Sequence, residues 1–150
     1  MAASFRLLHA GIVAVTTLTY FLPLLLLGNA PYLGVFNLEQ LQALSFASLR
    51  LHGVGYNIGL VFFGIHCALI GYLIWKSTFL PRVLGLLMTI AGVCYLVNSF
   101  AAFLAPAFKA AIYPAVLMPA GLAELSLTAW LLIVGVNVQR WQQQASALRG

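Results

Sequence analysis

Four long apolar stretches constrain the fold of this chain more than any other feature. They cover residues 7–27, 53–75, 81–105 and 114–138, and charged side chains are almost absent from them. A helix needs about 20 apolar residues to cross the bilayer core, so each stretch is long enough for one crossing. Soluble domains carry about 25% charged residues, whereas 6% of this chain is charged and 63% is hydrophobic. We therefore expect an all-α integral membrane bundle of four transmembrane helices, forming a single domain.

A segment of mixed character separates the first two stretches. Over residues 38–50, leucines recur at helical spacing among polar residues, which gives a helix one apolar and one polar face. Asn37 precedes it and Gln40 follows three residues later, which is the pattern of a capping box. We expect a short amphipathic interfacial helix over about 38–50 that lies on the membrane surface or leads directly into the second span. It could form a lid over a cavity, but a simple connector is the favoured interpretation.

The positions of the basic residues predict an orientation. With four spans, the two termini and the loop between spans two and three lie on the same side of the membrane. That side carries Arg6, Lys76, Arg82, Arg140 and Arg149, and the opposite side carries Arg50 and Lys109, with Glu39. Lys and Arg are enriched in cytoplasmic loops, so we expect both termini in the cytoplasm and the chain in the cytoplasmic (inner) membrane. The basic residues stand singly between apolar runs, so the expected partner is the lipid bilayer and not nucleic acid.

Polar residues within the spans are the candidate site. Glu124 lies roughly 15 Å into the fourth span at 1.5 Å per residue, near the midplane, and His66 lies roughly 13 Å from the cytoplasmic end of the second. Thr17 and Tyr95 fall near the same level, with Asn98 about one turn further out. These groups could bind a ligand or relay protons, because ionisable residues at membrane depth are costly and often functional. The favoured alternative is a protonated Glu124 that ties helices together through one hydrogen bond.

Cofactor and catalytic motifs are weak or absent. His52 and His66 stand on similar faces of one helix, a spacing that helices holding two haems use, but each haem needs a second axial ligand. Only His9 remains among the three histidines, so no haem or other cofactor is expected. Cys67 and Cys94 have no CxxC partner and read as small buried hydrophobes, so no metal site is expected. No catalytic motif is recognisable, and we do not expect an enzyme.

Glycines recur at close helical spacing in the second and third stretches. Gly55 and Gly59 form a GxxxG pattern, and Gly85 and Gly92 extend the small-residue pattern. Small residues let helix backbones approach closely in membranes. We expect these glycines to pack helices within the bundle; a face for a homo-oligomer or a partner subunit is the alternative.

Several short stretches carry a family resemblance. They are EQLQAL (39–44), GLVFFGIHC (59–67), GYLIWKS (71–77), FLPRVLG (79–85), ELS (124–126), WLL (130–132) and GVN (135–137). In these stretches the chain resembles domain-of-unknown-function family 4386, which consists of bacterial multi-pass membrane proteins. The resemblance implies a membrane-embedded helical bundle and implies no activity.

Two departures from the family pattern affect these expectations. Members usually carry about two further helices ahead of the segment that resembles Phe5 onward, so this chain is expected to correspond to the C-terminal four helices of a six-helix protein. Members also often have Asp where this chain has Asn98, which removes one acid and weakens a proton relay. We expect a non-enzymatic structural or accessory membrane protein, with a small-molecule, ion or proton pathway at Glu124 and His66 as the alternative.

Overall fold

The structure, a computed structural model, describes residues 1–28 and 30–147. All regular elements in this part of the chain are helices, and it contains no strand. In chain order they are α1 (Ala2–Leu26), η1 (Pro31–Val35), α2 (Leu38–Lys76), α3 (Arg82–Leu104), α4 (Pro106–Ile112), η2 (Ala115–Leu117), α5 (Met118–Ile133) and α6 (Val138–Ala147). Four segments are long and apolar enough to cross a membrane: Ala2–Leu26, Leu38–Lys76, Arg82–Leu104 and Ala115–Ile133. The predicted all-α bundle is confirmed.

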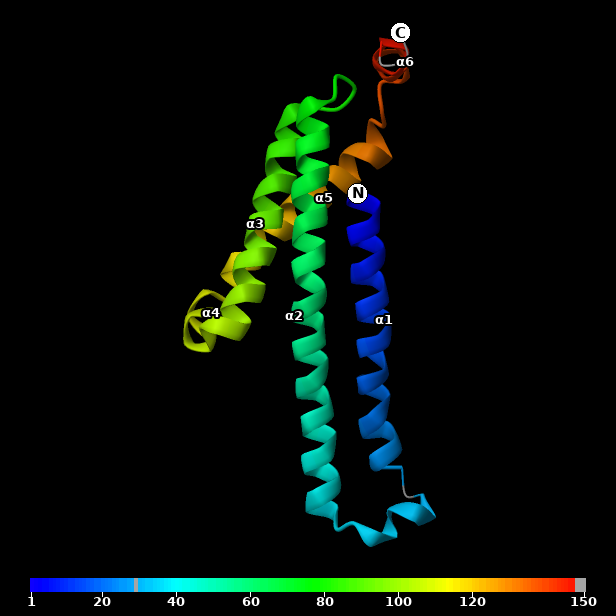
Figure 1. Cartoon of the computed structure of the whole chain (residues 1–150), viewed down its shortest axis with the longest axis vertical. Helices are drawn as coiled ribbons and strands as arrows, with labels where there is room; N and C mark the ends of the chain where they lie inside the picture. The colour runs from blue at the N-terminus through cyan, green and yellow to red at the C-terminus, as the bar shows by residue number, and fades with distance from the viewer. Residues whose placement is uncertain (29, 148–150) are drawn as a thin grey trace.

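The long helix α2 is the spine of the molecule. Its 39 residues correspond to about 58 Å at 1.5 Å per residue, which is nearly twice the thickness of a bilayer core. Helix α1 runs antiparallel along one part of α2, α3 runs antiparallel along another, and α5 packs on α3 (Figure 1). The segment 38–50 is therefore not a separate interfacial helix, because it continues without a break into the second span.

The start of α2 follows from its capping residues. The Asn37 side chain accepts a hydrogen bond from the Gln40 backbone N–H at 2.8 Å, and the Gln40 side chain accepts one from the Asn37 N–H at 3.0 Å. These reciprocal bonds satisfy two backbone donors that a helix start otherwise leaves unpaired. Pro31 and Gly34 precede this cap, and neither proline nor glycine occurs again before Gly53. The helix therefore begins at the predicted cap and meets no breaker between 38 and 50.

Helices α1 and α3 contact α2 at different levels. The Ala2 carbonyl oxygen pairs with His66, and the Thr19 carbonyl oxygen with Ser48, so α1 lies beside the part of α2 that includes Ser48 to His66. Helix α3 instead begins near the C-terminal end of α2, where Gly85 contacts Gly71. The ten-residue difference between His66 and Lys76 places the start of α1 about 15 Å from the end of α2 along its axis.

Glycines make the α2–α3 contact possible. A Cβ added to Gly92 would lie 2.6 Å from the Gly64 carbonyl oxygen, and one added to Gly85 would lie 2.7 Å from the Gly71 carbonyl oxygen. The two contacts are seven residues apart on each helix, the repeat of a left-handed helix pair. On the other side of α2, a Cβ at Gly55 would overlap Thr16, and one at Gly59 would approach His9 to 3.3 Å. All four predicted packing glycines therefore face another helix of the same chain.

The C-terminal part of the chain is more divided than predicted. The expected span 114–138 begins with the short helix η2, continues as α5 and ends at Ile133, because Gly135 turns the chain with a positive φ of 75°. Pro119 falls within the predicted span but stands in the first turn of α5, where a missing N–H disturbs nothing. Pro23 lies inside α1. The short helix α4 between α3 and η2 was not predicted.

The buried core lies between α2, α3 and α5. Its members are Cys67, Ile74, Leu84, Met88, Ala91, Ala120 and Ala123. Cys67 is buried and unpaired and fills space as a small apolar side chain, as predicted. Helix α1 has no fully buried residue; Ile12 and Val13 pack against Gly59 of α2 and are half-buried.

Candidate functional site

The acid in the fourth span contacts a neighbouring helix directly. The hydroxyl of Tyr95 on α3 donates a hydrogen bond to Glu124 Oε1 on α5 at 2.6 Å. Ala120 and Ala123, on the preceding turn of α5, are fully buried, and their small side chains let α5 approach α3 closely. Tyr95 and Glu124 are both partly buried. This is the one pair among the predicted site residues that the structure joins by a hydrogen bond.

Phe63 on α2 connects this pair to the N-terminal helix. Its ring centroid lies 5.1 Å from that of Tyr95 and 5.8 Å from that of His66. On the side of α1, the ring stacks with His9 at 4.7 Å, and the guanidinium carbon of Arg6 lies 4.7 Å from its centroid. An arginine over an aromatic face makes a favourable cation–π contact. Polar groups from α1, α2 and α3 therefore surround one aromatic ring.

The three histidines tie α1 to α2 and do not reach Glu124. In α2, the Nδ1 atoms of His66 and His52 lie 3.0 Å from the carbonyl oxygens of Ala2 and Thr16. In α1, Nδ1 of His9 lies 3.0 Å from the Gly59 carbonyl oxygen. A carbonyl oxygen can only accept, so each Nδ1 carries the proton and donates it. The Phe63 ring lies between His66 and the Tyr95 that bonds Glu124.

Two predicted site residues lie elsewhere. Thr17 donates to the Val13 carbonyl oxygen of its own helix at 2.7 Å. Asn98 is buried near the far end of α3 and donates from Nδ2 to Asn57 Oδ1 on α2 at 3.2 Å. The five predicted residues therefore form three separate groups. Thr17 is separated because α1 is shifted along α2, so equal depth within each span does not mean equal height in the bundle. Asn98 is separated because it lies farther along α3 than Tyr95 and bonds to α2.

Arg6 and Phe63 were missed by the sequence interpretation. Arg6 lies just outside the first predicted span. Because α1 begins at Ala2, Arg6 is part of this helix and its guanidinium contacts Phe63 of α2. A sequence signal for Arg6 exists, since it stands three residues before His9 and helix positions three apart share a face. Phe63 gave no signal, because it is one of ten phenylalanines in an apolar sequence.

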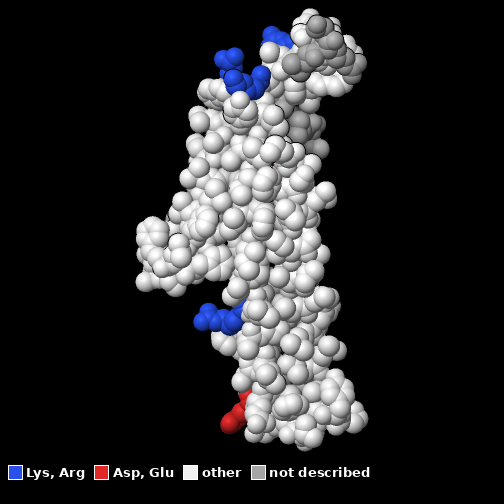
Figure 2. All heavy atoms as spheres, viewed as in Figure 1, with Lys and Arg blue, Asp and Glu red and all other residues white. Residues whose placement is uncertain are grey.

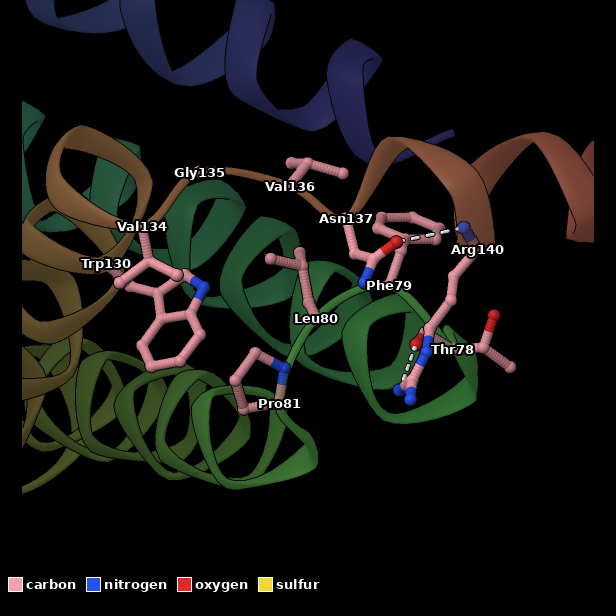
Figure 3. A pocket seen from close by; sticks show the side chains of 10 residues that line it. All are labelled: Thr78, Phe79, Leu80, Pro81, Trp130, Val134, Gly135, Val136, Asn137 and Arg140. Carbon is pink, nitrogen blue, oxygen red and sulfur yellow. Dashed lines mark hydrogen bonds between the residues drawn. The ribbon is translucent and has the colours of Figure 1, made fainter.

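Five hollows on the surface lie away from the predicted site, since Glu124, His66 and Tyr95 line none of the five. One of about 380 Å³ lies between the α2–α3 loop and the link from α5 to α6 (Figure 3). At its rim, Asn137 Oδ1 caps α6 by accepting from the Arg140 N–H at 3.0 Å, and the Arg140 guanidinium donates to the Thr78 carbonyl oxygen at 3.5 Å. These bonds attach α6 to the α2–α3 loop.

No metal site is evident in the part of the chain that the structure describes. Within residues 1–28 and 30–147, no three His, Cys, Asp or Glu side chains are grouped so that they could hold an ion.

Comparison with known proteins identifies relatives of this chain. The chain is 33% identical over 79 residues to an uncharacterized protein of Archaeoglobus fulgidus, a match that covers 53% of this chain and 45% of the relative. The chain thus spans less than half the length of that relative. No solved structure matches significantly. The family described as Domain of unknown function (DUF4386) matches residues 1–135. The chain therefore belongs to this family, as its sequence resemblance predicted.

Proposed function

We propose that this chain is a multi-pass integral membrane protein of the bacterial cytoplasmic membrane with a non-enzymatic structural or accessory role. The observation that carries the proposal is the bond between Tyr95 and Glu124. It gives the acid of the fourth span a partner on another helix. Buried polar groups in membrane bundles commonly serve as such ties between helices.

The lipid bilayer is the partner that the outer surface favours. Large apolar side chains are exposed along α1, including Leu18, Phe21 and Leu24. The glycines that could have formed a dimer face are occupied by contacts within the chain. Self-association through them would require the bundle to open, so we propose that lipid covers the outer faces.

The proposed orientation places both termini in the cytoplasm. Lys76 ends α2, Arg82 begins α3, and Arg140 bonds to the loop between them, so basic side chains gather at one end of the molecule (Figure 2). Arg50 and Lys109 lie further along the bundle. Arg149 belongs to the same prediction but lies outside the described residues. The positive-inside rule favours the end with more basic residues as the cytoplasmic one.

Substitution of Glu124 tests the structural role. In Glu124→Gln the amide oxygen still accepts from the Tyr95 hydroxyl, so thermal stability in detergent should stay unchanged. Glu124→Leu removes the acceptor and should cost about 0.6–1.7 kcal/mol, the range for hydrogen bonds between membrane helices. The cellular phenotype of a deletion strain should be rescued by Glu124→Gln. If this variant folds but fails to rescue, the carboxyl group is needed for its charge and the structural proposal is wrong.

A second candidate function is an ion or proton pathway through Glu124 and His66. The observation in its favour is the Phe63 ring, which contacts Tyr95 and His66 and lies beneath Arg6. The test is proton flux into proteoliposomes that contain the purified chain. Flux that Glu124→Gln abolishes would support the pathway, whereas flux equal to that of empty liposomes would contradict it.

A further inference from the structure

The largest of the five hollows lies away from Glu124, between the middle of α2, the end of α3 and the short helix α4. Its volume is about 610 Å³. Arg50 and Asn57 of α2 contribute to one wall, and Lys109 and Tyr113 contribute from α4 and its end. Figure 2 shows a recess beneath the lobe that α4 forms, with a basic side chain at its lower edge. We refer to this hollow as the α4 recess.

The charges of the α4 recess are all positive. Arg50 and Lys109 line it, and no carboxylate does. The chain has only two acidic residues, of which Glu124 is bonded to Tyr95, and Glu39 stands eleven residues before Arg50, about 16 Å away along the helix. Two cations in one recess repel each other, and an anion between them would remove that repulsion.

Polar side chains behind the cations provide a second, independent observation. Asn57 and Asn98 are 8% and 2% exposed. Asn57 lines the recess, and its Oδ1 accepts from Asn98 Nδ2 at 3.2 Å and from Lys109 Nζ at 3.4 Å. Asn98 Oδ1 has no hydrogen-bond partner. Buried polar groups are nearly always paired. The cluster therefore has a free hydrogen-bond acceptor beyond the bonds that join α2 to α3.

The two cations of the recess share one position relative to the uncharged parts of α2 and α3. The 25 residues of α2 between Arg50 and Lys76 carry no charge, and the same holds for the 26 residues between Arg82 and Lys109. Each uncharged run is long enough for one crossing of a bilayer core. Arg50 and Lys109 therefore stand together at the same end of the two runs.

We propose that the α4 recess binds the phosphate group of an anionic molecule. Arg50 and Lys109 provide the charged contacts, because guanidinium and ammonium groups form the strongest hydrogen bonds to phosphate oxygens. Lys109 exchanges its long bond to Asn57 for the ligand, and the Tyr113 hydroxyl is a further donor on the wall. The phosphate can belong to a lipid headgroup or to a soluble molecule. The proposal is independent of the role proposed for Glu124.

Lysine labelling of the unaltered chain tests the proposal. Lys109 and Lys76 are its only lysines, and they stand at opposite ends of the uncharged runs, so Lys76 is an internal control. The full chain is kept in an uncharged maltoside detergent and treated with an acetylating reagent. The reaction is run in the presence of phosphatidylglycerol, of diacylglycerol with the same acyl chains, or of inorganic phosphate. Mass spectrometry of peptides then gives the rate at each lysine. We expect a bound phosphate to slow acetylation of Lys109 by about tenfold, because a charged hydrogen bond holds its amine.

The outcomes separate the two sources of phosphate. Protection of Lys109 by phosphatidylglycerol but not by diacylglycerol or inorganic phosphate identifies a lipid headgroup. Protection by inorganic phosphate identifies a soluble ligand. If no probe protects Lys109, or if Lys76 is protected equally, the proposal is overturned.

A charge variant with a matched control provides the second test. Arg50→Gln should weaken binding of the protecting probe by about tenfold, the size of one charge-assisted hydrogen bond. Arg82→Gln removes the same charge from the opposite end and should leave the affinity within about twofold, since a distant exposed charge is screened. Equal affinities in both variants would overturn the proposal. If Arg50→Gln loses its helical circular dichroism, labelling of the unaltered chain still decides.

Discussion

At the scale of single residues, absent side chains matter as much as present ones. Gly64 and Gly92 face each other so closely that the backbone of one helix fills the space of the other's missing Cβ. Gly11, in contrast, has nothing within 4 Å of an added Cβ. Both kinds of glycine look alike in the sequence, because both stand inside apolar helical stretches.

Gly92→Ala should destabilise the bundle by about 1–3 kcal/mol, the usual cost of inserting a methyl group into a packed contact. Its Cβ would lie 2.6 Å from the Gly64 carbonyl oxygen, so the backbones of α2 and α3 must separate. Unfolding of the purified protein in mixed detergent measures the change. Gly11→Ala is the control and should be neutral or stabilising by up to about 1 kcal/mol, because alanine favours the helix. Equal effects at both positions would contradict this account of the contact.

The histidines show what residue type alone leaves open. The sequence offered His66 as a partner for Glu124, and the structure pairs its Nδ1 with the Ala2 carbonyl oxygen. A histidine donates to whichever acceptor lies within reach. The acceptor is decided by the register of α1 against α2, which no property of His66 itself determines.

At the scale of elements, local signals predict where helices begin and end. Asn37 and Gln40 predicted a capping box, and both of its bonds are present. Of the two placements expected for residues 38–50, the structure has the second, since the segment leads directly into the second span and α2 continues to Lys76. The change from mixed to apolar composition marks a change of environment along one helix and does not interrupt its hydrogen bonds.

Asn37→Ala should fray the first turn of α2 and cost about 1 kcal/mol, the typical contribution of an N-cap. The Gln40 backbone N–H loses its acceptor, so hydrogen exchange should speed up at Gln40 and Leu41. Gln42→Ala alters a neighbouring exposed side chain outside the capping box and should leave these exchange rates unchanged. Unaltered exchange in Asn37→Ala would show that the cap does not hold this end.

Gly135→Ala should weaken the attachment of α6. The residue has φ 75°, a conformation that costs an L-residue about 1–2 kcal/mol. The turn positions α6 so that Thr78 can donate to Gln144 Oε1 at 3.1 Å from both its backbone N–H and its hydroxyl. Faster hydrogen exchange at Thr78 is the expected result. Gly121→Ala, a helical glycine with open space around it, is the control and should not change that rate.

At the scale of the whole molecule, an even number of crossings places both ends on one side. The four apolar helices and the basic residues at one end of α2 and α3 give a definite prediction for reporters fused after residue 150. A green fluorescent protein fusion should fluoresce and an alkaline phosphatase fusion should be inactive, because the first works in the cytoplasm and the second outside it. The reverse pattern would invert the proposed topology.

The sequence by itself determined the class of the protein, its four apolar helices, the cap of α2 and the family to which the chain belongs. These properties depend on composition and on neighbours within a few residues, and they need no knowledge of how helices meet. The candidate site was predictable only as a set of polar residues. Tyr95 and Glu124 lie on adjacent helices and meet, whereas His66, Thr17 and Asn98 are directed to other partners.

Only the tertiary structure decided the shift of α1 along α2. This shift brings Arg6 onto Phe63 and pairs each histidine with a carbonyl oxygen. The packing of α3 on α2 separately places Asn98 beside Asn57. Helix register in an apolar bundle depends on how small residues and side chains on two surfaces fit together. That fit is a property of pairs of helices far apart in the sequence, so the hydropathy of each stretch cannot determine it.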